Sequence, residues 1–181
     1  SDLPKIDYGK RLTEATKSGE GDYVIICRND ADYLAWADSI KNFRMKQGIT
    51  TVIYTIDDVG GNSVAAIEAF VNDAYYNWAT PPAAVLLMGD YEYITSQSYS
   101  HPYSGSFVTD NKYADVDDGT PNGPEDDLPE IVFARMTAKN TTHVETMVTK
   151  FLEYERNPPT NTDFYDHPIT ALGWQTERWF Q

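Results

Sequence analysis

The sequence predicts an α/β fold, a layered and mostly parallel sheet with helices on both faces. Short runs of aliphatic and β-branched residues recur along the chain, and such continuous apolar runs are typical of strands covered on both sides. Several segments between these runs carry an apolar residue every three or four positions, the period of an amphipathic helix. Strand and helix thus alternate, which predicts parallel strands joined by right-handed crossovers.

The first predicted elements follow a polar lead-in, residues 1–22. The sequence predicts a buried strand over Tyr23–Cys27, and the helix that follows this strand is expected to end at Gly48. Candidate N-caps for that helix are Asn29, Asp30 and Asp32. Its expected buried positions are Tyr33, Trp36, Ala37, Ile40 and Phe43.

The second strand is expected over Thr50–Ile56, and the third over Ala83–Met88. Gly60 and Gly61 form a turn into the helix between them, which the proline pair at 81–82 prevents from continuing. The buried stripe of this helix is expected to contain Ala66, Ile67, Phe70, Val71, Ala74 and Trp78.

A long insert, Tyr91 to about Glu125, interrupts the pattern. It is too long for an ordinary connection, which indicates a function or a bound group that holds it. One short strand is expected inside it, near Phe107–Val108 or Lys112–Ala114. After the insert the sequence predicts a fourth strand over Pro129–Met136 and a fifth strand from Ile169 to Trp174. Between them it predicts a helix that begins with a Thr142–Glu145 capping box. The expected buried residues of this helix are Val144, Met147, Val148, Phe151 and Tyr154. Residues 23–181 are therefore expected to form one unit.

Composition narrows the class of function. The chain has 181 residues, with 28 acidic against 14 basic side chains and a net charge of −14. Nucleic acid and anionic membrane surfaces are poor partners for such a chain, and cations, calcium above all, are better ones. One cysteine supplies neither a disulfide nor a zinc framework. No apolar run approaches the roughly 20 residues of a membrane span, and the first residues shown do not have the pattern expected of a signal peptide.

The candidate nucleophile and bases are few. Cys27 lies within a predicted buried strand, where a cysteine is usually an inert small hydrophobe. His101, His143 and His167 have no sequence context that suggests a catalytic base. The sequence has no Gly-x-Ser-x-Gly elbow, phosphate-binding loop or dinucleotide-binding motif.

The carboxylates leave three interpretations open. Asp90 follows the third strand, and many acidic residues gather around the insert: Asp115, Asp117, Asp118, Glu125, Asp126, Asp127 and Glu130. Carboxylates and backbone carbonyls in such a loop suit calcium, but a solvated acidic loop has the same composition. A third interpretation joins Asp57 and Asp58, after the second strand, to Asp90 in a magnesium-binding pocket of a phosphoryl-transfer enzyme.

Seven segments form an ordered set of motifs: Trp36, 46–48, 66–71, Leu86–Asp90, Thr109–Asp117, Leu128–Met136 and Met147–Arg156. Over roughly Tyr23 to Gln181, these motifs together resemble the gingipain family of cysteine peptidases. The resemblance implies a caspase-like α/β fold of two side-by-side subdomains, and a thiolate with a histidine as the catalytic pair. In that family the pair and the residues that select the substrate lie on the second subdomain. No residue of this chain matches them.

The resemblance therefore implies a non-catalytic amino-terminal subdomain, inactive alone, of a secreted or cell-surface cysteine endopeptidase. Its partners would be the carboxyl-terminal catalytic subdomain and, for the whole enzyme, protein or peptide substrates. A family calcium site carried over by position gives the side chains of Asp90, Asp117, Asp126 and Glu130 and the Leu128 carbonyl as ligands. Asp115 or Asp118 can substitute for Asp117. Glu177 aligns with an acidic residue near the family's active site.

Two rival functions from other classes stay open at this level. One is a stand-alone calcium-dependent binding module that uses the acidic insert, and the other is the magnesium enzyme built on Asp57, Asp58 and Asp90. The resemblance is expected to bring an exposed apolar edge near Leu172–Phe180. The magnesium enzyme requires Asp57 and Asp90 to converge.

Overall fold

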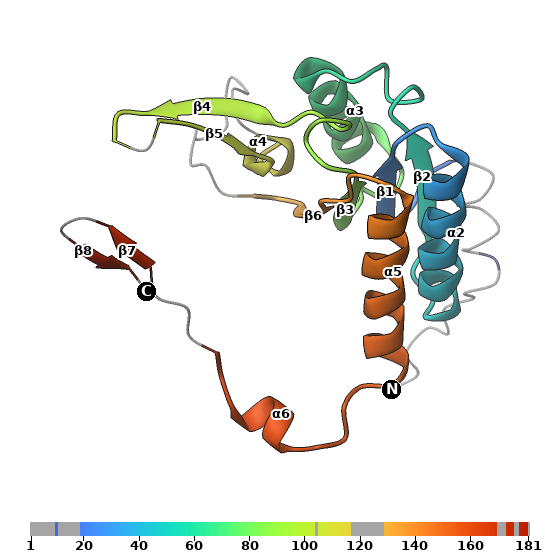
Figure 1. Ribbon diagram of the computed structural model, residues 1–181. Coiled ribbons are helices and arrows are strands. Elements are labelled where there is room, and N and C mark those ends of the chain that lie inside the picture. The colour runs from blue at the N-terminus through green and yellow to red at the C-terminus, as the bar shows by residue number, and fades with distance from the viewer. Residues whose placement is uncertain are drawn as a thin grey trace, which may run out of the picture.

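The core of the computed structural model is a four-stranded parallel sheet (Figure 1). The structure describes residue 10 and residues 19–103, 105–116, 129–169, 173–175 and 178–180. The strand order is β2-β1-β3-β6, with all three pairings parallel. The strands are β1 (Tyr23–Cys27), β2 (Thr51–Thr55), β3 (Ala84–Met88) and β6 (Val132–Met136). This confirms the predicted layered α/β fold and its four main strands.

Helices cover both faces of the sheet, as predicted. Helix α3 (Val64–Asn77) covers one face, and α2 (Ala31–Lys46) and α5 (Thr141–Arg156) cover the other. Strand β1 shows the division most clearly, because its alternate side chains belong to the two separate cores. Val24 and Ile26 pack in the core under α3, whereas Ile25 and Cys27 pack under α2 and α5. A strand buried on both faces has the continuous apolar sequence from which it was predicted.

The helix ends follow local capping chemistry. Among the three N-cap candidates of α2, the structure selects Asp30, whose carboxylate accepts from the backbone N–H groups of Asp32 and Tyr33. Gly48 follows the helix with a φ of +83°, which glycine adopts without strain. The capping box predicted from Thr142 and Glu145 is wrong. Asn140 is the N-cap of α5, because its side-chain oxygen reaches the N–H of His143 at 2.9 Å and starts the helix earlier.

Helices α2 and α5 are joined by an ion pair over aromatic rings. The Arg44 guanidinium donates two hydrogen bonds to the Glu155 carboxylate, each 2.8 Å long. It also lies 4.8 Å from the ring centroid of Phe151, and Phe43 meets Phe151 edge to face. The Tyr-Glu sequence at the end of α5 thus has a structural role. Tyr154 differs from the prediction, since it is 48% exposed.

The insert folds differently from the single short strand that was expected. It forms an antiparallel hairpin of β4 (Gln97–His101) and β5 (Gly105–Thr109), followed by the short helix α4 (Asn111–Ala114). Phe107 and Val108 do lie in a strand, but residues 112–114 are helical. In Figure 1 the hairpin projects beyond the β6 side of the sheet.

The chain after α5 leaves the core. It passes through α6 (Asp163–Asp166) to a second antiparallel hairpin, β7 (Gly173–Gln175) with β8 (Arg178–Phe180). The predicted fifth strand is therefore wrong as a member of the main sheet. Ile169 is 96% exposed and lies outside any strand, and Gly173–Gln175 pairs only within the hairpin of its own sheet. Among the described helices, none is long and apolar enough to span a membrane.

We expect Glu155→Gln to lower the free energy of unfolding by about 1 kcal/mol, because a bidentate, partly buried ion pair between two helices is lost. Urea unfolding measures it. Glu153→Gln, on an exposed position of the same helix, makes the same change of charge and is expected to alter stability by less than about 0.5 kcal/mol. Equal effects of the two substitutions would contradict a specific role for the Arg44–Glu155 pair.

Candidate functional site

The carboxyl ends of the four parallel strands meet at one edge of the sheet, where ligand sites of open α/β sheets usually lie. Each strand is followed there by polar residues. Arg28 and Asn29 follow β1, Asp57 and Asp58 follow β2, Asp90 follows β3, and Lys139 lies after β6. The edge is thus built from both signs of charge.

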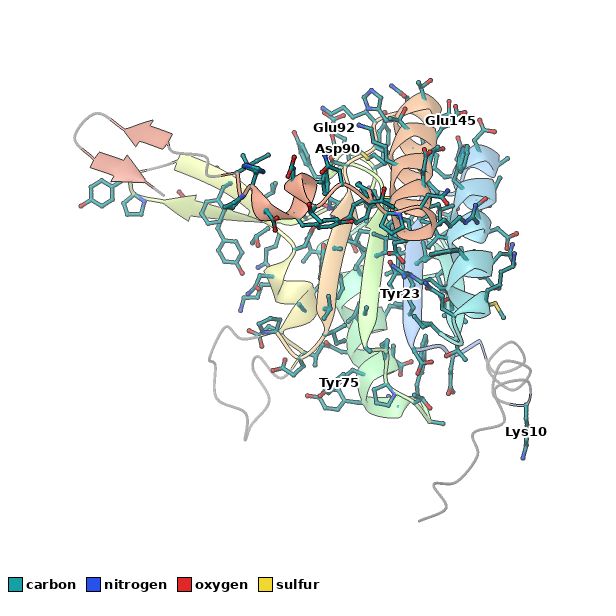
Figure 2. All side chains as sticks on the ribbon, turned by 90° about the horizontal axis from the view of Figure 1, so that it is seen from below. Lys10, Tyr23, Tyr75, Asp90, Glu92 and Glu145 are labelled. Atoms are coloured by element: carbon teal, nitrogen blue, oxygen red, sulfur yellow. The ribbon has the colours of Figure 1, made fainter. Side chains whose placement is uncertain are left out.

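Asp90 is held in place by two neighbouring groups. It is only 6% exposed; its Oδ1 accepts from the Tyr91 N–H at 2.9 Å, and the Lys139 ammonium lies 3.2 Å from its Oδ2. Burial by itself raises the pKa of Asp90, but the hydrogen bonds from Lys139 and Tyr91, with the nearby charges of Lys139 and Arg135, bring the net pKa below its ordinary value. Figure 2 shows Asp90 beside the amino-terminal end of α5. Asp90 is thus an ionised carboxylate with a lysine beside it.

Asp57 and Asp58 have local partners. Asp57 accepts a hydrogen bond from the Asn29 side chain, and Asp58 accepts from the N–H and hydroxyl of Thr55 at 2.8 and 2.6 Å. These Thr55 bonds lower the pKa of Asp58. Because β1 lies between β2 and β3, Asp57 and Asp90 are not on neighbouring strands as the magnesium interpretation assumed. The structure does not bring them together, and the predicted magnesium pocket is wrong.

The predicted calcium ligands are only partly described. Asp117, Asp126 and Leu128 lie outside the described residues, as does Glu177. Glu130 is described and lies two residues before β6, whereas Asp90 lies two residues after β3. The register pairs Ala84 with Val132, so the two acids are eight positions apart along parallel strands, roughly 26 Å at about 3.3 Å per residue. The structure does not bring Asp90 and Glu130 together.

The described residues on the two sides of the acidic loop, residues 117–128, are hydrogen-bonded to each other at the amino end of β6. The backbone N–H groups of Glu130 and Ile131 donate to the Ala114 carbonyl, and the Val116 N–H donates to Glu130 Oε2 at 3.0 Å. Asp115, between these residues, is 3% exposed. The Glu130 carboxylate therefore lies beside the backbone of Val116, the last described residue before the acidic loop. Within the described residues, no three His, Cys, Asp or Glu side chains gather as a metal site.

Arg135 organises the insert, a role that the sequence analysis did not assign. Its guanidinium donates to both oxygens of Asp110 at 2.7 and 2.8 Å, and its side chain is 9% exposed. The remaining N–H groups reach the carbonyls of Gly89 and Ile94, each at 2.8 Å, and the Ser96 hydroxyl at 3.0 Å. All five donors are used. The available signal was an arginine inside an otherwise apolar strand, because such a charge needs a partner.

Cys27 is buried in the core, as expected. It is 0% exposed, and burial, followed by the charge of Asp58, raises the pKa of its thiol to about 12. His143 is exposed in the first turn of α5, and His167 Nδ1 lies 2.7 Å from the Asp163 carbonyl. The side chain of His101 lies outside the described residues. Cys27 thus lacks both the exposure and the ionisation that a nucleophilic thiol requires.

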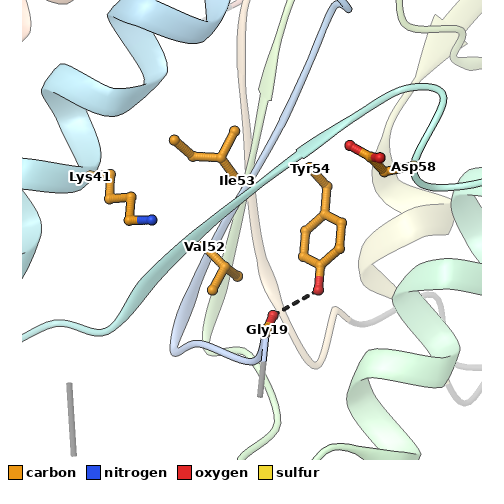
Figure 3. Close-up of a pocket in the computed structure, with 6 residues that line it drawn as sticks. All are labelled: Gly19, Lys41, Val52, Ile53, Tyr54 and Asp58. Carbon is orange, nitrogen blue, oxygen red and sulfur yellow. Dashed lines mark hydrogen bonds between the residues drawn. The ribbon is translucent and has the colours of Figure 1, made fainter. Parts of the chain in front are cut away.

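A separate pocket lies against β2, at the opposite side of the sheet from β6 (Figure 3). Its volume is about 500 Å³. The Tyr54 hydroxyl donates to the Gly19 carbonyl at 2.7 Å across it. The lining residues are Gly19, Lys41, Val52, Ile53, Tyr54 and Asp58. None of the predicted calcium ligands belongs to this pocket.

Comparison with known proteins gives one family. The sequence model described as peptidase family C25 matches residues 16–173. No curated protein sequence matches the chain.

Three solved structures share the fold. The crystal structure of dimeric latent PorU from Porphyromonas gingivalis aligns at 15% identity with a TM-score of 0.57, over 87% of this chain and 18% of PorU. The Arg-specific cysteine proteinase gingipain R aligns at 20% identity with a TM-score of 0.60, over 77% of this chain and 29% of gingipain R. A further protease structure gives 20% identity and a TM-score of 0.61, with the same coverage. The chain thus spans less than a third of the length of each.

We expect Arg135→Met to lower the free energy of unfolding by about 3–5 kcal/mol, because it leaves the Asp110 carboxylate without its buried counter-ion. Urea unfolding measures the loss, and hydrogen exchange is expected to speed up first in residues 89–110. Lys150→Met removes a cation from an exposed position of α5 and should change stability by less than about 0.5 kcal/mol. If Arg135→Met fails to fold, Asp110→Asn tests the same pair. Wild-type stability and exchange in both variants would contradict the role of Arg135.

The Cys27 thiol is expected to resist a thiol reagent in the native protein and to react fully after unfolding in urea. Ser98→Cys adds an exposed thiol on β4 as a positive control. Because the folded pKa of about 12 exceeds the ordinary 9.0, the stabilising effect of Cys27 is complete below pH 9 and is lost as the pH rises toward 12. Comparison with Cys27→Ala isolates this loss. Fast native labelling of Cys27 would show that the thiol is not buried.

Proposed function

The chain belongs to peptidase family C25, and from this membership we propose that it is the non-catalytic, amino-terminal half of a gingipain-like cysteine endopeptidase. The observation that carries the proposal is the state of its one cysteine. Cys27 packs in the core beneath α2 and α5, with its thiol pKa raised to about 12. A thiol in this environment does not form the thiolate that attacks a scissile carbonyl.

The two histidines whose side chains the structure describes support the same proposal. Catalysis by a cysteine–histidine pair requires the two side chains within hydrogen-bond reach of each other. His143 lies on the exposed surface of α5, and His167 lies on the arm that leaves the core. Cys27 has no exposed surface on which to meet either of them. The catalytic pair of the enzyme would therefore come from a second subdomain.

The sheet has an edge suited to hold that second subdomain. Strand β6 is an edge strand of the sheet, and Val132 on it is 69% exposed. The chain aligns with 29% of gingipain R, which leaves most of that protein outside the match. This chain would buttress the catalytic subdomain along the β6 side. As in the gingipains that it resembles, the enzyme would be secreted or held at the cell surface and would act on proteins or peptides.

We further propose that a structural calcium ion binds at the base of the insert. The Glu130 carboxylate accepts from the N–H of Val116, which follows the buried Asp115 in the sequence. Asp117, Asp126 and the Leu128 carbonyl are the further ligands that the family resemblance implies. A divalent cation there would relieve the repulsion among these carboxylates and hold the loop closed. Asp90 is left out of this set, because it pairs with Lys139 at the other end of the strands.

The test of the non-catalytic role is peptide hydrolysis by the purified chain. We expect no cleavage of peptides that contain arginine or lysine, with or without calcium, and no labelling by a reagent that alkylates active-site thiols. Hydrolysis that disappears in Cys27→Ala would overturn the proposal. Hydrolysis that persists in Cys27→Ala would point to a contaminating enzyme, which a further purification step separates from the chain.

Thermal unfolding tests the calcium site. Calcium at 100 times its dissociation constant is expected to stabilise the chain by about 2.7 kcal/mol, and magnesium and a chelator should not. Glu130→Gln is expected to abolish this shift, whereas Asp90→Asn, at the other end of the strands, should retain it. Loss of the shift in Asp90→Asn alone would restore Asp90 as a ligand. No shift with calcium in the wild-type chain would identify the acidic loop as solvated charge.

A further inference from the structure

The β4–β5 hairpin is an uncharged arm on a strongly acidic protein. Residues 97–109 contain no Asp, Glu, Lys or Arg, although the whole chain has a net charge of −14. Figures 1 and 2 both show the hairpin extending away from the core. Two copies of the chain repel each other over about 10 Å at 0.1 M ionic strength. Contact through this arm keeps the charged surfaces of the two copies apart.

Strand β5 is an edge without the usual protection. All five of its residues pair in register with β4, so the strand has no bulge, and it has no proline and no charge. Phe107 and Val108 point to opposite faces and are 48% and 47% exposed. Natural edge strands usually carry a charge, a proline or a bulge that prevents pairing with another chain. A hairpin of two strands is marginally stable in water, and more strands stabilise it. Strand β5 is therefore suited to accept another strand.

The sequence of β5 permits pairing with a second copy of itself. Phe107 is the central residue of Gly105–Thr109. If two copies pair antiparallel about a two-fold axis at this residue, Phe107 faces its own equivalent and Ser106 faces Val108. Such pairing joins no like charges and places two aromatic rings side by side, which stabilises cross-strand pairs. Both copies then use the same surface, as a two-fold symmetric dimer requires.

We propose that this chain forms a homodimer in which β5 pairs antiparallel with β5 of a second copy about a two-fold axis at Phe107. The two hairpins form one four-stranded sheet in the order β4-β5-β5-β4. This inference uses neither the catalytic residues nor the calcium site, and it requires only that a catalytic subdomain on the β6 side leave the outer edge of β5 open.

Disulfide trapping in the whole 181-residue chain tests the register. Across antiparallel strands, paired Cα atoms are about 4.5–5.5 Å apart, within the range that a disulfide spans. Phe107→Cys is therefore expected to give a covalent dimer under mild oxidation, while buried Cys27 does not interfere. Tyr99→Cys is the matched control, because Tyr99 pairs with Phe107 within the hairpin. Two Tyr99 positions would be three strand spacings apart, about 14 Å, and should stay monomeric.

Sedimentation equilibrium tests the dimer without a cross-link. We expect the wild-type mass to double with concentration, and the dimer to strengthen as salt screens the acidic surfaces. Val108→Glu should return the chain to a monomer. Ser98→Glu adds the same charge at the position opposite Val108, one strand away from the interface, and should still dimerise. Circular dichroism checks that both variants fold.

Three results would overturn the proposal. They are a wild-type chain that stays monomeric at every concentration and salt, equal effects of the two glutamate substitutions, and trapping of Tyr99→Cys as readily as Phe107→Cys. The last result would assign the contact to β4.

Discussion

The arrangement of the insert depends on one buried guanidinium. Arg135 leaves β6 and donates all five of its hydrogen bonds to the carbonyls after β3, the Ser96 hydroxyl and the Asp110 carboxylate. Removing a charge from water is costly unless it is paired and fully hydrogen-bonded, and this geometry meets both conditions. The guanidinium joins the sheet to both ends of the hairpin segment, so the hairpin starts from a fixed base although it projects from the core.

The two ends of the parallel strands have different chemistry. At the carboxyl end, Asp90 is balanced by Lys139, and Asp57 and Asp58 are held by neighbouring side chains. These carboxylates are engaged in the local structure. At the amino end of β6, Glu130 closes the base of a loop that contains many acidic residues. A cation has more to stabilise there, which is why we place the proposed calcium at that end.

Sequence reasoning succeeded where burial determines structure. The continuous apolar runs of β1 and β3 and the 3.6-residue periods of α2 and α3 identified the sheet, its layers and the inert Cys27. It failed where the outcome depends on contacts between distant segments. The magnesium pocket assumed that β2 and β3 are neighbours, but the crossover places β1 between them. The bonds from Arg135 to Asp110 and Gly89 connect residues 25 and 46 positions apart, and no local pattern reports such pairs.

We propose that this chain supports a catalytic subdomain and performs no catalysis itself. The most direct measurement is the rate of hydrolysis of an arginine or lysine peptide by the separately produced catalytic subdomain of the same enzyme, titrated with this chain. We expect the rate to rise and saturate as the two halves associate, and Cys27→Ala in this chain to give the same curve. A catalytic half that is fully active alone, with a rate that this chain does not change, would show that the proposed supporting role is wrong.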